Sequence, residues 1–239
     1  MKNTTDSTRY PKQAGDRHQR RSQARMMEGR IARWYTRQRA SADQMAVVRR
    51  SAAELTEGLP SGADVLEVAP GPGFHAVEMA RSGRFRVTGL DISHTFVEIA
   101  TENARKEGVS VAFRHGEAAD LPFEAESFDL IVCQAAFKNF GQPLKAIDEM
   151  HRVLRPGGTA VIQDMNGEVS GAQIHQAVKE MGISAPNALL TRVALTALRR
   201  RAYSPARFRK LVAESAFGTC VVTTEGIGVD VLLTKRATS

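Results

Sequence analysis

Short apolar runs alternate with amphipathic stretches along most of the chain. Five runs of β-forming residues predict buried strands, at 65–68, 85–90, 109–113, 128–133 and 159–164. Between them, apolar residues at helical spacing predict three helices: one that ends near Gly83, one that ends near Gly108 and one at 143–154. Two further runs, 220–224 and 228–234, predict a closing strand pair. This alternation indicates an α/β fold, a doubly wound and mostly parallel seven-stranded sheet.

Helices are also predicted outside this alternating core. Apolar residues among arginines predict one from about residue 25, and another covers about 42–57. Two more, at 174–181 and 188–201, form an insertion after the fifth strand. We therefore expect a basic leader at 1–24, an N-terminal helical lid at 25–58 and an α/β domain at 59–239 whose cap insertion spans 165–203. Trp34 is expected to pack the leader onto the body; the rival role is closing over a ligand.

The stretch 64–91 reads as strand, glycine-rich turn, helix and second strand, and it ends at Asp91. This is one half of a nucleotide-binding sheet, with the ligand expected beyond the carboxyl ends of the strands. Glu67 lies inside the turn, where it would repel a pyrophosphate and attract a cationic amine. A nicotinamide-dependent oxidoreductase on the same architecture is therefore the weaker interpretation.

The turn at 67–73 resembles motif I of the class I S-adenosylmethionine-dependent methyltransferases, usually written E/D-x-G-x-G-x-G, with Ala69 at the first glycine. Three later stretches resemble the same family in order and spacing: 116–123, 128–132 and 154–158. The pattern is most similar to the ubiquinone/menaquinone-biosynthesis type of methyltransferase. Its Leu-Pro-Phe, Phe-Asp, Lys-Asn and Glu-Met-x-Arg-Val-Leu-x-Pro-Gly-Gly elements match 121–123, 128–129, 138–139 and 149–158.

The resemblance implies S-adenosylmethionine as cofactor and S-adenosylhomocysteine as product. It places the methionine end at the glycine-rich turn, the ribose hydroxyls at Asp91 and the adenine near the third and fourth strands. The cofactor-binding residues that it implies are Glu67, Ala69, Gly71, Gly73, Asp91, Ile92, Gly116, Glu117, Ala118 and Gln134.

The reaction would be an in-line displacement on an already activated methyl group, so alignment and exclusion of water matter most. A base is needed only where the acceptor must lose a proton. Tyr35, His75 and His94 are the candidate catalytic residues, because we expect them at the carboxyl edge of the sheet. His115 and Asp164 also qualify by position.

We expect methyl transfer to a small-molecule acceptor that is quinone-like, phenolic or heteroaromatic. The Asn/Asp-Pro-Pro-aromatic motif of enzymes that methylate amino groups of bases or glutamine is missing after the fourth strand, so a nucleic-acid substrate is disfavoured. An RNA or protein methyltransferase that captures its substrate with the basic leader is the alternative. A non-catalytic cofactor-binding partner protein is another.

Charge and composition refine this interpretation. The net charge of +7 comes from the leader, because residues 1–39 hold 11 Lys/Arg and 3 Asp/Glu, whereas 40–239 hold 22 and 23. Cys133 and Cys220 both lie in apolar runs and read as buried thiols, with no metal-binding spacing. No run is long enough to span a membrane and no secretory signal is visible, so a cytoplasmic location is expected. A homodimer is left open.

Overall fold

The computed structural model describes residues 28–237 and confirms one seven-stranded sheet in the order β3-β2-β1-β4-β5-β7-β6. All strand pairs are parallel except β5–β7 and β6–β7. The strands are β1 (Asp64–Val68), β2 (Arg86–Asp91), β3 (Val111–His115), β4 (Phe128–Gln134), β5 (Leu154–Met165), β6 (Val221–Glu225) and β7 (Gly228–Thr234).

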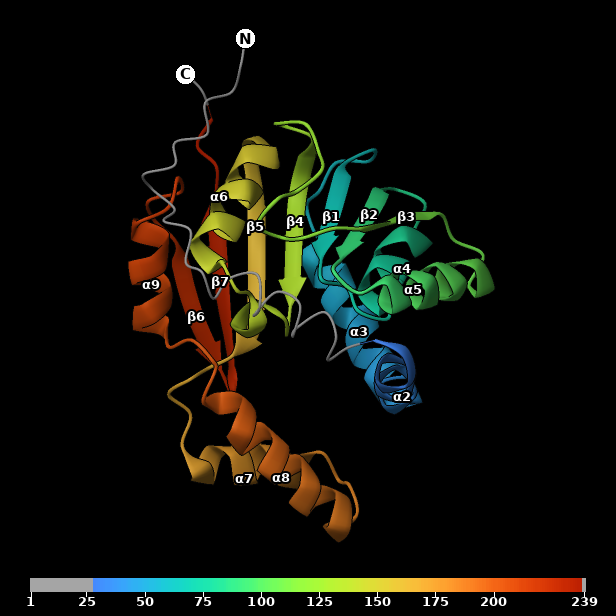
Figure 1. Cartoon of the computed structure of the whole chain (residues 1–239), viewed down its shortest axis with the longest axis vertical. Coiled ribbons are helices and arrows are strands. Elements are labelled where there is room, and N and C mark those ends of the chain that lie inside the picture. The colour runs from blue at the N-terminus through green and yellow to red at the C-terminus, as the bar shows by residue number, and fades with distance from the viewer. Residues whose placement is uncertain (1–27, 238–239) are drawn as a thin grey trace.

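Helices cover both faces of the sheet (Figure 1). The N-terminal part contributes α2 (Gly29–Gln38), α3 (Ala42–Leu55), α4 (Phe74–Arg81) and α5 (His94–Lys106). The short helix η1 (Phe137–Asn139) and α6 (Pro143–Val153) follow β4, and α7 (Gly171–Glu180), α8 (Ala185–Arg199) and α9 (Pro205–Ala213) follow β5.

Alternate residues of each central strand face two different apolar clusters. Ile131 and Cys133 of β4 pack with α6 and α9, while Leu130 and Val132 pack with α3 and α4. Near-continuous apolar strands such as β4 are therefore explained by burial on both sides. This double cover fixes the strand ends, and with them the candidate site, in a rigid frame.

Several predicted boundaries were wrong by a few residues. The third strand begins at Val111 instead of residue 109, and Cys220 is half-buried just before β6. The fifth strand begins at Leu154, within the stretch expected to be a turn, because Leu154 pairs with Phe128 of β4 across a register shift. The sequence pattern cannot show such pairing, which depends on the neighbouring strand.

The N-terminal region also differs from expectation. The basic leader at 1–24 and the predicted helix start near residue 25 lie outside the described residues. Trp34 does not pack onto the body, since it is 57% exposed. Its neighbour Tyr35 makes that contact instead, edge-on against Phe96 of α5. Trp34 and Tyr35 are adjacent and both aromatic, so the sequence does not show which of them faces the body. The packing of α2 against α5 decides it.

The cap insertion expected at 165–203 is present as α7 and α8, which form an arm beyond the edge where the parallel strands end (Figure 1). Both helices begin about three residues earlier than predicted, at Gly171 and Ala185. A complete capping box at Ser170 and Gln173 fixes the first of these starts. The second start has Pro186 in its first turn.

Candidate active site

The turn between β1 and α4 bends through three residues with positive φ. Ala69, Gly71 and Gly73 have φ values of 58°, 54° and 77°. At Gly73 a Cβ would lie 2.7 Å from Phe113 Cζ and 2.8 Å from Ala100 Cβ, so only glycine fits. Ala69 adopts the same region at a cost of about 1–2 kcal/mol. Its N–H donates to Leu90 O at 2.8 Å, which holds the turn against β2.

Glu67 is a buried carboxyl group directly beneath this turn. It lies in β1 with 2% of its surface exposed, and its Oε2 accepts a hydrogen bond of 2.8 Å from Ala76 N in the first turn of α4. Burial raises the pKa of Glu67 to about 8, against the opposing effect of the Ala76 bond, and nearby Asp91 raises it further. No basic side chain among the described residues forms an ion pair with it. A buried carboxyl group without a cationic partner is chemically suited to bind a positively charged ligand group.

Asp91 ties the end of β2 to the glycine-rich turn. Its Oδ2 accepts from Gly71 N at 3.0 Å and its Oδ1 accepts from Ser93 N at 2.8 Å. Burial raises the pKa of Asp91, and the two backbone hydrogen bonds act in the opposite direction. Each carboxylate oxygen keeps a lone pair for a further donor. The expectation that Glu67 and Asp91 lie together near the turn is met by this geometry.

The residues expected near the adenine follow β2 and β3. Gly116 N donates to Asp91 O at 2.9 Å, so this loop begins directly beside the acidic residue. His115 Nε2 lies 3.0 Å from Ile92 O. Glu117 and Asp120 close a short turn, and Ala118 packs against the α6-side core. The structure therefore brings Ile92, Gly116, Glu117 and Ala118 to the same strand edge as Asp91.

The three candidate catalytic residues come from three helices around this edge. Tyr35 of α2 contacts Phe96, whose ring in turn lies near Gly71. His75 lies in the first turn of α4, and burial lowers its pKa to about 4, with the charge of Arg39 as a smaller cause. His94 stacks on His115 with ring centroids 3.6 Å apart and an angle of 6°. Among the described residues no hydrogen bond joins one candidate to another.

Glu28 anchors the N-terminal helices to this region, and the sequence pattern did not reveal it. Its carboxylate accepts from His94 N at 3.0 Å and from Thr95 N at 3.1 Å, at the start of α5, and it also bonds the Thr95 hydroxyl. An acidic group at a helix N-terminus is favoured by the exposed N–H groups there. The contact places α2 beside the carboxyl edge of the sheet.

A polar row crosses the ends of β4, β5 and β7 on the α3 side of the sheet. Gln134 Nε2 donates to Gln163 Oε1 at 2.5 Å and to Ser51 Oγ of α3 at 3.1 Å. Gln163 Nε2 donates to Asp230 Oδ2 at 3.3 Å. Gln134 Oε1 is buried without a hydrogen-bond partner among the described residues, which leaves an acceptor unsatisfied at the site. Of these residues the sequence indicated Gln134 alone, because Gln163 and Asp230 come beside it only through the register of the paired strands.

Asp164, which position alone made a candidate base, is committed to Lys138 of η1. Lys138 Nζ lies 2.7 Å from Oδ1 and Lys138 N donates to Oδ2 at 2.9 Å. Both side chains are nearly buried, 6% and 2% exposed. Both carboxylate oxygens of Asp164 thus already have partners, a buried ammonium and a backbone N–H. The pair instead fixes the loop after β4.

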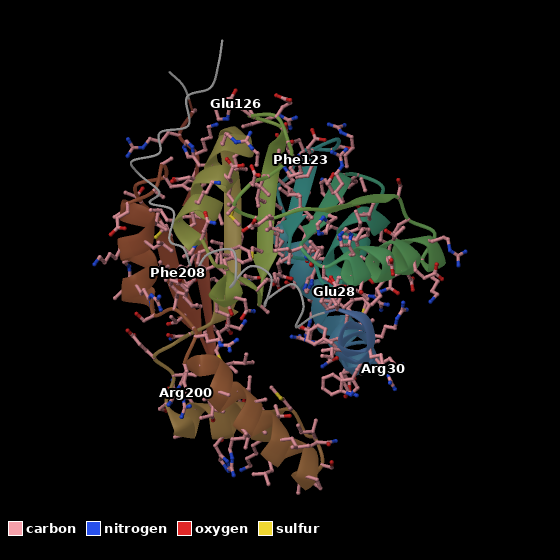
Figure 2. All side chains as sticks on the ribbon, viewed as in Figure 1. Glu28, Arg30, Phe123, Glu126, Arg200 and Phe208 are labelled. Carbon is pink, nitrogen blue, oxygen red and sulfur yellow. The ribbon has the colours of Figure 1, made fainter. Side chains whose placement is uncertain are left out.

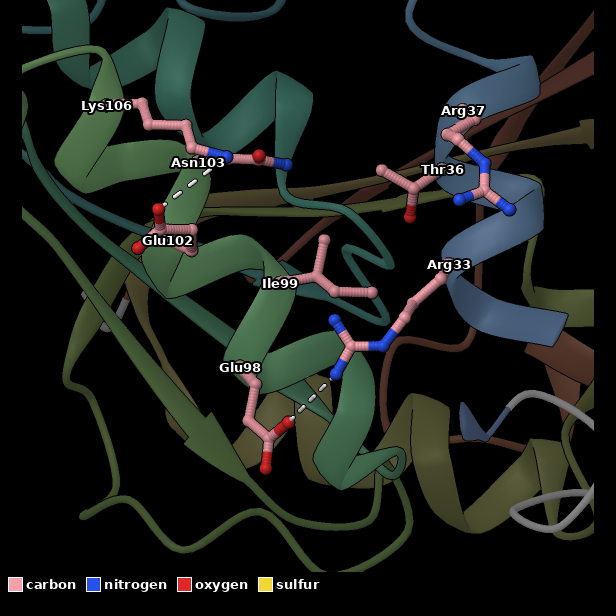
Figure 3. A pocket seen from close by; sticks show the side chains of 8 residues that line it. All are labelled: Arg33, Thr36, Arg37, Glu98, Ile99, Glu102, Asn103 and Lys106. Carbon is pink, nitrogen blue, oxygen red and sulfur yellow. Dashed lines mark ion pairs between the residues drawn. The ribbon is translucent and has the colours of Figure 1, made fainter. Parts of the chain in front are cut away.

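A hollow between α2 and α5 is separate from this site. Figure 3 shows it lined by opposed charges, with Arg33 4.0 Å from Glu98 and Lys106 3.6 Å from Glu102. All four of these side chains are at least 45% exposed, so water screens the pairs. The hollow has no buried polar group for a ligand to satisfy. Within the described residues no cluster of three or more potential metal ligands occurs.

Comparisons with known proteins find similarity to methyltransferases. Residues 66–162 match the family described as methyltransferase domain. The chain is 34% identical over 124 residues to a demethylmenaquinone methyltransferase of Deinococcus radiodurans, covering 52% of this chain and 51% of the relative. It is 32% identical over 114 residues to the ubiquinone/menaquinone biosynthesis C-methyltransferase UbiE of Bdellovibrio bacteriovorus, covering 47% and 48%. The chain thus spans about half the length of the curated relatives that it matches.

One solved structure extends the fold likeness over most of the chain. A candidate S-adenosyl-L-methionine-dependent methyltransferase of Methanococcus maripaludis aligns with 95% of this chain and 97% of that one. The TM-score is 0.65 at 17% identity, which bears on the fold alone.

Proposed function

We propose that this chain transfers a methyl group from S-adenosylmethionine to a small-molecule acceptor, since residues 66–162 match the family described as methyltransferase domain. The observation that carries the proposal is the pair Glu67 and Asp91. Both carboxyl groups are buried, both lie under the glycine-rich turn, and neither forms an ion pair among the described residues. Burying two such groups is costly unless a ligand compensates.

The residues present fit this cofactor chemically. Glu67 offers a desolvated carboxyl oxygen to the cationic α-amine, and Asp91 has lone pairs for the two ribose hydroxyls. Gln134 contributes a buried acceptor that has no other partner among the described residues. The glycine-rich turn lets backbone approach the ligand closely, because Gly71 and Gly73 carry no Cβ. When bound, the cofactor supplies an activated methyl group.

Beyond the activated methyl group, methyl transfer requires that the acceptor be aligned with the methyl group and that water be excluded. We propose that α2 and α3 on one side and the α7–α8 arm on the other form the lid over the acceptor. Glu28 and Tyr35 support this role, since both attach α2 to α5 beside the site. Positioning of this kind can lower a barrier by about 7–11 kcal/mol.

The acceptor class is proposed to be a quinone-like, phenolic or heteroaromatic ring. The relatives' names support a quinone-like ring, with methylation at carbon. Tyr35, His75 and His94 are the proposed proton acceptors. His75 is neutral near pH 7, because burial lowers its pKa to about 4, so it can accept a proton but is a weak base.

Isothermal titration calorimetry with S-adenosylmethionine and S-adenosylhomocysteine tests the cofactor half of the proposal. We expect both to bind the full chain. Absence of binding by either ligand would refute the function. A panel of ring hydroxyls, ring amines and quinols, scored by release of S-adenosylhomocysteine, then tests the acceptor class. Cofactor binding without turnover on any ring acceptor would move the assignment to another acceptor or to a non-catalytic role.

A further inference from the structure

Helix α8 is apolar on two opposite sides, and only one side is covered. Ala188 and Leu195 face α7, where they pack against Ile174 and Val178. On the other side Leu190 and Val193 are 69% and 61% exposed, and none of the 15 residues of α8 is buried. A helix that is apolar all round normally has partners on both sides. The outer face of α8 therefore lacks one in the part of the chain that the structure describes.

The charge around this face has a single sign. Residues 181–201 contain four arginines and no Asp or Glu. Arg199 donates to Val169 O and Arg192 lies 3.3 Å from His175 Nδ1, so both are used within the arm. Arg200 and Arg201, at the end of α8, form no ion pair within residues 28–237. The partner of this face should offer negative charge together with apolar material.

Helix α2 repeats the pattern. Ile31 and Trp34 are 51% and 57% exposed, and residues 29–42 contain four arginines and no acidic residue. Figures 1 and 2 show α2 and α8 on either side of the end of the molecule where the parallel strands stop, with Arg30 on one and Arg200 on the other. Tryptophan and arginine together are typical of surfaces at a bilayer–water interface.

We propose that the outer faces of α8 and α2 dock this chain on an anionic lipid bilayer. The exposed apolar side chains would enter the boundary between headgroups and acyl chains, and the arginines would contact lipid phosphates. No helix of the described residues is long and apolar enough to cross a membrane, so the chain would lie on the surface. The open edge of the sheet would then face the bilayer.

A second copy of the chain fits this surface less well. A twofold interface would bring the same patch of each copy together, and residues 181–201 offer no acidic residue to pair with the arginines. Like charges at an interface cost binding free energy, whereas anionic headgroups neutralise them. An exposed apolar stripe together with arginines that lack acidic partners within the described residues therefore favours a lipid bilayer over a second copy of the chain as the binding partner.

Vesicle flotation with the full chain tests the proposal. We expect binding to phosphatidylcholine vesicles that contain about 30% phosphatidylglycerol, much weaker binding to phosphatidylcholine alone, and loss of binding as salt screens the charges. Replacing Leu190 and Val193 together by Ser should weaken binding to the anionic vesicles at least about tenfold, since two apolar side chains no longer enter the bilayer. Arg200→Gln with Arg201→Gln should weaken binding to the anionic vesicles only.

Val221→Ser is the matched control. Val221 is 60% exposed, but it lies on the edge strand β6, away from α8 and α2. Its replacement should leave vesicle binding unchanged. Circular dichroism and calorimetric affinity for S-adenosylmethionine check that each variant is folded.

Two results would overturn the proposal. One is equal flotation of the wild-type chain and the Leu190→Ser, Val193→Ser variant. The other is a dimer in sedimentation velocity that the same substitutions abolish, which would identify a second copy as the occupant. The proposal does not depend on methyl transfer: flotation without cofactor binding would refute the proposed function and leave the docking surface intact.

Discussion

The β1–α4 turn and the α7–α8 arm are both connections between strands, yet they use their residues in opposite ways. At the turn Glu67 is 2% exposed and accepts from Ala76 N, while Asp91 accepts from Gly71 N and Ser93 N. In the arm, α8 has no buried residue, and the local core consists of Val169, Ile174 and Val178. The turn is fixed by hydrogen bonds to individual atoms, whereas α8 is packed on one side only.

The difference follows from what lies beneath each region. The turn lies between the sheet and the helices α4 and α5, so a methyl group added at Gly73 would meet Phe113 and Ala100. The arm projects past the edge where the parallel strands end, and its small core meets the body at Met165 of β5 and at Ile227 (Figure 1). The turn resembles a family motif, while the arm matches no motif that we identified. Under the proposed function, the turn would hold the cofactor and the arm would contact the acceptor.

The largest expected effect is a loss of stability caused by a substitution in the β1–α4 turn. Gly73→Ala should lower the free energy of unfolding by about 3 kcal/mol, because the new methyl group meets Phe113 and Ala100 while φ stays positive. Gly83→Ala is the control: φ there is +65° but the space is open, so about 1 kcal/mol is expected. Urea unfolding measures both. Equal losses would mean that the turn is not closely packed.

The next effect concerns ligand affinity. Asp91→Asn should weaken S-adenosylmethionine binding by about tenfold or more, because an amide replaces a carboxylate that accepts from Gly71 and Ser93. Calorimetry measures the affinity, with Asp43→Asn on the exposed start of α3 as control. Unchanged affinity would move the ribose contact away from the end of β2.

The third effect depends on pH. The pKa of Glu67 in the folded chain is raised to about 8 from an ordinary 4.5, so the folded form keeps a proton that the unfolded form loses. Its contribution to stability is full below about pH 4.5 and is lost as pH rises through about 8, with a slope of at most about 1.4 kcal/mol per pH unit. Glu67→Gln should remove this slope in unfolding experiments between pH 5 and 8. Parallel curves for the two proteins would show that Glu67 titrates normally.

The smallest global effect is expected in the arm. Ile174→Ala should increase hydrogen exchange within 171–199 but change global unfolding by less than about 0.5 kcal/mol, because the arm can open separately from the sheet. Ile147→Ala, on the buried face of α6, should cost about 2–5 kcal/mol. A global loss of that size at Ile174 would show that the arm is part of the cooperative core.

Much of the fold could be predicted because its signals are local. Apolar runs identified all seven strands, and Gly71, Gly73 and Asp91 marked the turn and the strand end at which the candidate site lies. The contributions of Glu28, Gln163 and Asp230 were missed. Each is an isolated polar residue in sequence, and only docking of α2 or strand register brings it to the site.

The chain's order of apolar and polar residues by itself determined the α/β alternation, the glycine-rich turn and the acidic residues on either side of it, because each depends on neighbours within a few positions. Tertiary structure alone decided that Tyr35 packs while Trp34 is exposed, that Asp164 is taken by Lys138 and that one face of α8 stays uncovered. These outcomes depend on which surfaces meet after the chain collapses, and burial of a side chain is a property of its surroundings.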